Sequence, residues 1–509
     1  MFTLVSQRAK NRALPAIAAG LILAGLAGCA AGPDWKKPAP PADTAYQASS
    51  AGTSSAGVKL QKVETGQQVA ADWYRLLGSG QLDSLVSQAL RSSPTLAAAQ
   101  ARFRAAGHDL EAVSGSRYPS IDVGAGVSRN RANGAQIGID NPLFSNVFDL
   151  YTANVSVSYA LDVAGGESRA IEESAAQARV ARDQLVGARV SLVDNVVVTA
   201  LQLATLRDEI KATRRVISLE KNSLKIVKAR EQAGAVPLSD TLQARTTLAD
   251  AQARLPALQK NLTAVETRLA ALVGETPSAF DAPHLSLANF TLPEDLPLSL
   301  PSELVSQRPD ILAAQARLHA ANAAVGVATA NLYPHITLTA HYGTQTNSAG
   351  NLFKSPAAVW GIGASLLYPL FHGEELRAKR DAARSRFNAA YADYRETVLQ
   401  AFAQVANVLG ALEQDARTLN AREQALASAA KSRRRVQAQY RAGAVDYTAV
   451  LGTEQAYQAA LINRIQALSA RYQDTAALYQ ALGGGWWNAA PAPHSMTATA
   501  ATQQEKTDD

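Results

Sequence analysis

One long passage occurs twice in this chain, and the duplication constrains the fold more than any other feature. Residues 308–336 read RPDILAAQARLHAANAAVGVATANLYPHI and align without a gap on residues 93–121, which read SPTLAAAQARFRAAGHDLEAVSGSRYPSI. The tetrapeptide Ala-Gly-Ala-Val also recurs, near the middle and near the end of the chain. Each half therefore predicts helix, strand, loop, strand, very long helix, glycine turn and helix. Two copies indicate a doubled module rather than a solenoid of many small units.

The first residues predict export from the cytoplasm. Arg8, Lys10 and Arg12 precede an apolar run too short to span a bilayer stably, so residues 1–28 are interpreted as a signal peptide. The run ends at Leu-Ala-Gly-Cys, which resembles the bacterial lipobox and predicts lipidation of Cys29 by several acyl chains. The alternative is an ordinary secretory signal followed by an unrelated cysteine. The chain has a single cysteine, so a disulfide framework and a thiolate metal site are excluded.

The two repeats lie between segments of low complexity. Residues 29–70 and 488–509 are rich in small and polar residues, and they predict a tether and a disordered tail because they have too few large apolar side chains for a core. The first repeat spans residues 71–300, ending in a linker rich in Pro and Leu, and the second spans residues 301–487.

Four segments alternate apolar and polar residues with the period of a β-strand. The apolar positions of the first repeat are Ile121, Val123, Ala125 and Val127, then Tyr151, Ala153, Val155, Val157, Tyr159 and Leu161. Those of the second repeat are Ile336, Leu338, Ala340 and Tyr342, then Trp360, Ile362, Ala364, Leu366 and Tyr368. This alternation suits strands that cross an outer membrane. A soluble sheet packed on its apolar face is the alternative.

Aromatic residues gather at the ends of these four segments. They are Tyr118, Phe144, Tyr333, Phe353, Trp360, Tyr368 and Phe371. Aromatic girdles at the two membrane interfaces would explain the clustering. Four strands cannot close a barrel, and open sheet edges are not tolerated in lipid because their backbone groups go unpaired. If the strands cross a membrane, several subunits must therefore share one barrel.

Two very long helices are predicted, at residues 167–232 and 374–441, neither of which contains a proline. At about 1.5 Å per residue each helix would reach roughly 100 Å. Apolar residues recur seven apart within them, at Val196, Leu203, Ile210, Ile217 and Leu224, and at Val398, Val405, Leu412, Leu419 and Leu426. Sustained heptads indicate supercoiled helix packing. A separate coiled-coil rod is the alternative, but it leaves the strands unexplained.

Each long helix ends at the repeated Ala-Gly-Ala-Val. Gly234 and Gly443 suit a tight reversal, and return helices are expected at residues 238–273 and 447–482. Pro256 is expected to kink the first of these. The two turns are predicted to be the ends of the molecule farthest from the membrane.

Together these features resemble a known family, the outer-membrane factors of the TolC-like efflux class, in their lipoprotein NodT branch. The matching stretches are LAGCAAGPDWKKP, the passage from PSELVSQRPD to LYPHITL, VLQAFAQVANVL, YRAGAVDYTAVL and ALGGGW. The resemblance implies an α+β membrane protein that forms a homotrimer in outer-membrane lipid. It also implies one shared barrel of twelve strands, continued by a periplasmic barrel of twelve helices. Ala30 is not the acidic residue that retains many lipoproteins at the inner membrane, which agrees with an outer-membrane location.

The resemblance also implies partners and sites. A periplasmic adaptor would connect the channel to an inner-membrane pump, expected to be of the proton-driven RND type. Residues expected to form the adaptor-docking turns are Gly234, Val236, Gly443 and Val445. Residues expected to form a periplasmic gate are Tyr440, Arg441, Asp446 and Glu454. Gly452 stands where many relatives have an acidic residue, and the alternative for Arg441 and Asp446 is that they cap and solvate a helix end.

No motif predicts an enzyme, a cofactor or a metal site. Arg308-Pro309-Asp310 is interpreted as ordinary helix-start chemistry, and His335 and His341 share a strand face without the spacing of a metal motif. The basic run at 431–435 and the net charge of +6 are interpreted as solvated surface, because an exported chain does not meet nucleic acid.

The function that the resemblance implies is passive conduction of small amphipathic molecules, including antimicrobials, from a pump and adaptor to the exterior. Two alternatives stay open. The same fold can serve protein or peptide secretion, and a lipid-anchored coiled-coil protein can bridge envelope layers without a pore. Polar faces on all four strands argue against the second alternative.

Overall fold

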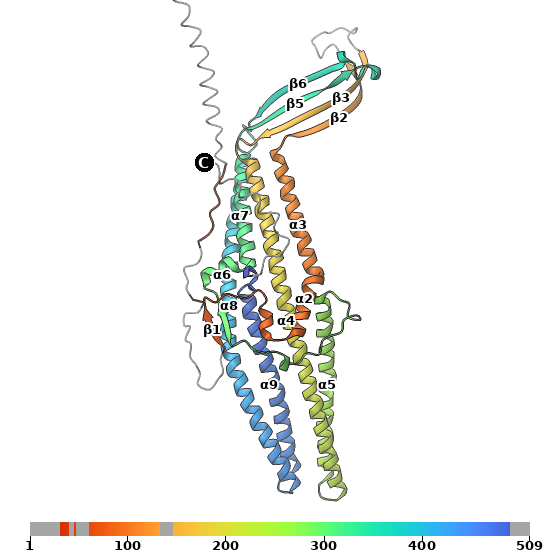
Figure 1. The fold of residues 1–509 in the computed structure, drawn as a ribbon, viewed down its shortest axis with the longest axis vertical. Helices are drawn as coiled ribbons and strands as arrows, with labels where there is room; N and C mark the ends of the chain where they lie inside the picture. The colour runs from red at the N-terminus through yellow and green to blue at the C-terminus, as the bar shows by residue number, and fades with distance from the viewer. Residues whose placement is uncertain (1–30, 40–44, 47–60, 133–145, 489–509) are drawn as a thin grey trace, which may run out of the picture. The chain divides into compact units, whose positions relative to one another are not determined.

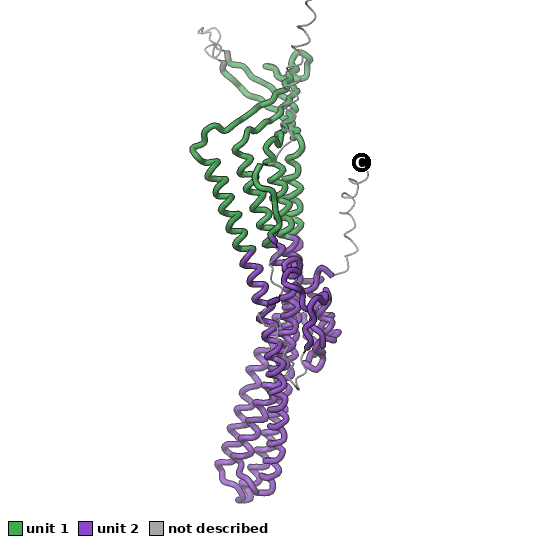
Figure 2. Tube along the Cα trace, turned by 90° about the vertical axis from the view of Figure 1, so that its left-hand side faces the viewer, with its two compact units in different colours: residues 1–38, 103–181, 314–394 green, residues 39–102, 182–313, 395–509 purple. Residues whose placement is uncertain are grey.

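The computed structural model describes residues 31–39, 45–46, 61–132 and 146–488. The predicted signal peptide, Cys29, Ala30, Phe144 and almost all of the C-terminal tail lie outside these residues. The chain divides into two compact units, shown in different colours in Figure 2. Unit 1 comprises residues 1–38, 103–181 and 314–394, and unit 2 comprises residues 39–102, 182–313 and 395–509.

Unit 1 contains a four-stranded antiparallel sheet, visible in Figure 1. Its strands are β2 (Ser120–Ala132), β3 (Asn146–Leu161), β5 (His335–Thr346) and β6 (Ala358–Leu367), in the order β2-β3-β5-β6. All four strands were expected from the alternation in the sequence. Both repeats contribute a neighbouring pair, and β2 and β6 are the edges.

The register places the predicted apolar residues on one face of the sheet. Val123 is paired with Val155, Val155 with Tyr342, and Tyr342 with Trp360, so one row of apolar side chains crosses all four strands. Val123 is 83% exposed and Ile362 is 81% exposed, so no part of the described chain covers this face at these positions. An uncovered apolar face that extends over four strands is unfavourable in water and is typical of a surface that contacts lipid or another protein.

The aromatic residues predicted at the strand ends are also exposed. Those that the structure describes are Tyr118, Tyr333, Phe353, Trp360, Tyr368 and Phe371, each more than half exposed. Leu370, beside the last of them, is exposed as well. The sheet therefore presents an apolar band with aromatic ends, as an outer-membrane strand set does.

The helices of unit 1 belong to elements that continue beyond it. They are parts of α3 (Pro94–Ser114), α4 (Gly166–Gln232), α7 (Pro309–Ala330) and α8 (Glu375–Arg441). The two long helices begin and end within one residue of their predicted bounds.

The beginning of the described chain is docked on α4 and α7, which a bare tether would not be. The Ala31 amide donates to the Ala164 carbonyl at 2.9 Å, and the buried Arg169 binds Asp34 at 2.7 Å. The Trp35 ring stacks on His319 with 4.5 Å between centroids. Residues 31–35 thus form a strap across unit 1.

Unit 2 contains the two helical hairpins and a small second sheet. Its helices are α2 (Gly80–Ser92), α5 (Leu238–Val273), α6 (Pro301–Gln307) and α9 (Tyr447–Ala481), with the remaining parts of α3, α4, α7 and α8. Strand β1 (Lys62–Thr65) pairs in parallel with β4 (Asp295–Leu298). The sequence predicted neither strand. Helix α5 continues on both sides of Pro256.

Short 3-10 helices complete the description. They are Trp73–Leu77, Gly115–Arg117, Leu287–Asn289, Ala349–Asn351, Ser355–Ala357 and Trp486–Asn488.

Most of the predicted heptad positions are buried in the core of unit 2. The buried ones are Val196, Leu203, Ile210, Ile217, Val398, Val405, Leu412 and Leu419. By length and composition alone α4 passes as a membrane span, with an 18-residue window of mean hydropathy 1.3. Its apolar run from Val196 to Ala204 is largely buried core, and 39% of the whole window is buried inside the structure.

Candidate functional site

The two hairpins of unit 2 end in turns of the same geometry. At the end of α4 the Gly234 amide donates to the Glu231 carbonyl and the Ala235 amide to the Arg230 carbonyl, each at 2.8 Å. At the end of α8 the Gly443 and Ala444 amides repeat this pattern. Both glycines are left-handed, with φ of 72° and 76°, as the Schellman motif requires.

The predicted docking residues differ in their surroundings. No heavy atom lies within 4 Å of a Cβ built on Gly234 or Gly443, so both glycines are open to a partner. Val236 and Val445 instead pack, half-buried, against an apolar cluster. The buried members of this tip cluster are Val227, Ala244, Tyr440, Tyr447 and Val450. The valines therefore anchor the turns, while the glycines face outward.

Tyr440 joins the two hairpins. The Arg230 guanidinium lies over its ring at 4.5 Å from the centroid and donates to its carbonyl oxygen at 3.0 Å. The Tyr440 ring also meets the Tyr447 ring edge-on, with 5.7 Å between centroids. The Tyr447 hydroxyl lies 3.3 Å from the Ser223 hydroxyl on α4. These contacts bind the end of α8 and the start of α9 to α4.

Arg441 and Asp446 lie at the junction of α8 and α9. Arg441 is the last residue of α8 and is exposed. Asp446 caps the start of α9, because its Oδ1 accepts from the Ala449 amide at 3.0 Å. The capping alternative thus describes the contact that Asp446 makes.

Glu454 belongs to a buried polar layer above the tip cluster. Its carboxylate is 3.6 Å from the Arg433 guanidinium and accepts a hydrogen bond from the Gln437 amide. The Arg433 guanidinium also lies 4.3 Å from the centroid of the Tyr457 ring. Burial raises the pKa of Glu454, while Arg433 and Gln437 oppose this shift.

A second carboxyl group, Glu220 of α4, completes this layer. It is 2% exposed and accepts a hydrogen bond from the Gln458 amide of α9 at 2.9 Å. Burial, with the charge of Glu454 as a further cause, raises its pKa to about 7. The sequence analysis did not select Glu220, because an acid in a charged helical stretch has no signal of its own until α9 packs against it.

Arg308, from the Arg-Pro-Asp motif, makes structural contacts. Arg308 donates hydrogen bonds to the Ala481 carbonyl at 2.6 Å and to the side chains of Asp310 and Gln404. It therefore connects the end of α9 to the start of α7. His335 and His341 are six residues apart on β5, which corresponds to about 20 Å, too far for one metal ion. No cluster of metal-ligating residues occurs among the described residues.

Comparison with known proteins gives the family. The family model described as outer membrane efflux protein matches residues 85–275 and 300–484. The pyoverdine export outer membrane protein OpmQ of Pseudomonas aeruginosa is 31% identical over 416 residues, covering 81% of this chain and 87% of OpmQ. OprJ, an outer membrane protein of the same organism, is 27% identical over 479 residues, covering 92% of this chain and 96% of OprJ.

Solved structures agree with the sequence comparison. The outer-membrane channel OprN superposes with a TM-score of 0.82 at 27% identity, covering 90% of this chain and all of OprN. VceC, an outer membrane protein of Vibrio cholerae, gives a TM-score of 0.76 at 26% identity, covering 82% of this chain and all of VceC. Family and fold are those of channel proteins located in the outer membrane, and the resemblance stated from the sequence is confirmed: the chain belongs to the outer membrane efflux protein family.

Proposed function

We propose that this chain forms, as a homotrimer, the outer-membrane channel of a tripartite efflux system. The observation that carries the proposal is the four-stranded sheet of unit 1. Its apolar residues share one exposed face, its polar residues share the other, and β2 and β6 have no strand partner on their outer edges among the described residues. Three such sheets joined edge to edge would close one barrel with a polar interior.

Conduction through this channel would be passive. Glu220 and Glu454 of unit 2 lie between helices and are held by Gln458 and Arg433. Energy would come from an inner-membrane pump, expected to be of the proton-driven RND type, through a periplasmic adaptor. The two open glycine turns, at Gly234 and Gly443, are where the adaptor would dock.

The gate would lie at the same end of unit 2. Tyr440 and Glu454 hold α8 and α9 against each other and against α4, so a change at the turns would reach these contacts. Arg441 and Asp446 would contribute to the gate through exposed charge at the junction of α8 and α9. Such a gate uses small rearrangements of packed helices.

Lipidation of Cys29 would place an anchor beside the strands. Ala31 lies two residues after Cys29, and its amide is bound to Ala164, between the end of β3 and the start of α4. Two residues span at most about 7 Å, so acyl chains on Cys29 would meet the membrane near the strand ends. The strap at 31–35 gives this anchor a fixed attachment.

The cargo proposed for this channel is small amphipathic molecules, including antimicrobials. Among relatives, OpmQ is named for pyoverdine export and CusC of Escherichia coli, 26% identical, for cation efflux. These names favour small molecules over proteins as the cargo. Secretion of proteins or peptides is therefore the second candidate function. A non-conducting bridging lipoprotein is disfavoured by the polar sheet face.

Susceptibility of a deletion strain tests this function. Hypersensitivity to dyes, detergents and antibiotics, restored by the wild-type gene, is the expected result, and Cys29→Ser added back shows whether lipidation is needed. Purified protein in a planar bilayer should also conduct ions. Unchanged susceptibility combined with loss of a secreted protein would favour the secretion channel, and an absence of conductance would favour the bridging protein.

A further inference from the structure

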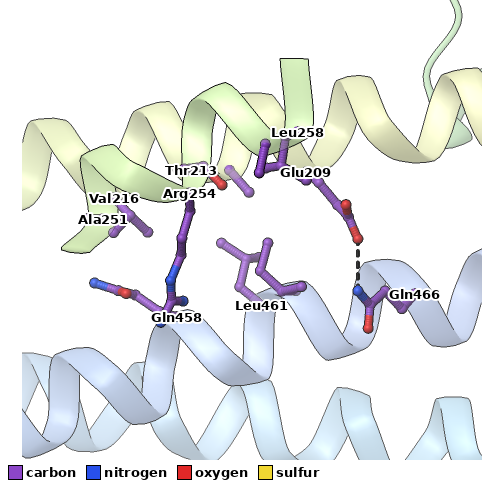
Figure 3. Close-up of a pocket in the computed structure, with 12 residues that line it drawn as sticks. Glu209, Thr213, Val216, Ala251, Arg254, Leu258, Gln458, Leu461 and Gln466 are labelled. Carbon is purple, nitrogen blue, oxygen red and sulfur yellow. Dashed lines mark hydrogen bonds between the residues drawn. The ribbon is translucent and has the colours of Figure 1, made fainter. Parts of the chain in front are cut away.

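A cavity of about 270 Å³ lies between three helices of unit 2, above the tip cluster. Helix α4 lines it from Glu209 to Val216, α5 from Ala251 to Leu258, and α9 from Gln458 to Gln466. Figure 3 shows its walls, with Leu258 and Leu461 facing each other across the middle. An engineered apolar cavity of about 150 Å³ holds benzene, so this cavity has room for an aromatic ring with a short side chain.

Two carboxyl–amide pairs bracket the cavity along the contact between α4 and α9. Glu209 accepts from the Gln466 amide at 3.0 Å at one end, and Glu220 accepts from Gln458 at the other. Between them the α4 wall consists of small or apolar side chains, with Thr213 the one lining residue that carries a hydroxyl group. The cavity is thus an apolar space with the Glu209 carboxyl group at one end and Gln458 and Arg254 at the other, while Glu220 lies behind Gln458 and outside the lining.

Glu209 is the unusual member of this wall. The residue is only 6% exposed, and its one hydrogen bond is donated by the neutral amide of Gln466. Among the described residues no cation forms an ion pair with it within 4 Å. Burial raises its pKa, which means that the charged form lacks the stabilisation that water or a cation would give. A cation delivered into the cavity would supply that stabilisation.

Access to the cavity lies on the α5 side. Arg254 and Ala257 line the cavity and are exposed at the surface of the described chain. Figure 3 shows the Arg254 side chain beside Gln458, at the end opposite Glu209. A ligand entering past Ala257 would therefore place a positive group toward Glu209 and away from Arg254, with its apolar body between Leu258 and Leu461.

From this geometry we infer that the three-helix cavity is a binding site for a small amphipathic cation, with Glu209 as its counter-ion. The ligand is an aromatic or aliphatic body of about one ring that carries a protonated amine. The site lies in the helix wall, and it goes beyond the proposed conduction function. Because its walls come from both hairpins, a bound ligand bridges α4 and α5 to α9.

Equilibrium dialysis of the full-length, detergent-solubilised protein tests the site. The probe is 2-phenylethylammonium, and 3-phenylpropionate is its anionic match in ring and chain length. We expect saturable binding of the cation and at least tenfold weaker binding of the anion. Glu209→Gln, which keeps the Gln466 hydrogen bond but removes the charge, should weaken cation binding at least about tenfold.

A blocking variant separates the cavity from partitioning into detergent. Ala257→Phe fills the entrance and should abolish saturable binding, while Ala253→Phe, at an exposed position of α5 that does not line the cavity, should leave it unchanged. Both positions are exposed, so neither variant is expected to disturb folding. Absence of saturable cation binding to the wild type would overturn the inference. So would binding that neither Glu209→Gln nor Ala257→Phe reduces, or equal binding of the anion.

Discussion

Glu220 makes the stability of the hairpins depend on pH. Its pKa is raised to about 7 by burial and by the charge of Glu454, with Gln458 and Arg433 opposing, whereas the unfolded chain ionises near 4.5. The folded state therefore holds a proton that the unfolded state has lost between these two values. Stability is full below about pH 4.5, falls as pH rises to about 7, and is flat above, a difference of at most about 3 kcal/mol per chain.

Replacing Glu220 by Gln should remove this pH dependence. The amide oxygen still accepts from Gln458, and no charge is buried at high pH. Melting of the helical signal should show the variant close to wild type at pH 5 and more stable than wild type at pH 8. Glu423→Gln, at an exposed carboxylate paired with Arg464, is the control and should follow wild type at both values. A wild-type melting temperature that rises from pH 5 to pH 8 would contradict the assignment.

Gly443 is the residue whose substitution tests the docking turn. A β-branched side chain at φ of 76° costs about 1–2 kcal/mol and distorts the turn, although it has open space around it. Gly443→Val, like Gly234→Val, should leave the trimer intact and fail to complement a deletion strain. Gly452→Ala is the matched control, because Gly452 lies within α9 with open space around it and alanine favours helix. Full complementation by both valine variants would remove the turns from the docking site.

The sequence predicted the roles of individual residues less well than it predicted the helices and strands. Gly234 and Gly443 were predictable because a left-handed turn selects glycine, and their repetition marked them. Glu209, Glu220 and Arg433 have no distinguishing pattern in the local sequence. Their contacts with α9 distinguish them, and for the two acids these contacts come from residues more than two hundred positions away. The gate candidates were chosen by resemblance, and of these Asp446 makes the contact of an ordinary helix cap.

The elements themselves were largely predictable, for different physical reasons. The four strands of unit 1 follow from strict alternation, because a period of two leaves only one register that keeps the apolar residues together. The hairpins follow from heptads and glycine turns. Strands β1 and β4 escaped prediction because each has four residues and β1 is exposed throughout, so pairing rather than pattern defines them. The strap at 31–35 was not predicted either, because its contacts with Ala164, Arg169 and His319 define it and its own sequence pattern does not.

Neighbouring positions on β3 test which face of the sheet meets lipid. Val155 lies on the apolar face and Ser156, the next residue, on the polar face. A lysine on the lipid side of a barrel costs about 2–4 kcal/mol near the middle of the bilayer, whereas a lysine facing the lumen is solvated. Val155→Lys should therefore reduce the amount of folded protein in the outer membrane, and Ser156→Lys should not. Equal yields of the two variants would favour a soluble sheet.

For the whole molecule, the proposed trimer rests on the open four-stranded sheet. The two halves of the chain each contribute a strand pair and a helical hairpin, and β2 and β6 have no outer partner in the part of the chain that the structure describes. Closing the edges through neighbouring copies, as proposed, would remove unpaired backbone groups from lipid and enclose the polar face. The sequence predicted this incompleteness. It did not predict the number of copies, which the family resemblance supplies.

Disulfide trapping between the edge strands tests whether neighbouring chains close the barrel. Within one chain β2 and β6 are separated by two strands, a distance of about 14 Å, which exceeds the reach of a disulfide. Val123→Cys on β2 should therefore react with Ile362→Cys or Ala364→Cys on β6 only between chains. We expect oxidised double variants to give a covalent ladder ending at three chains, and single variants, which retain Cys29, to stay monomeric in denaturing gels. No ladder for either pairing, in protein shown to be folded in the outer membrane, would contradict the shared barrel.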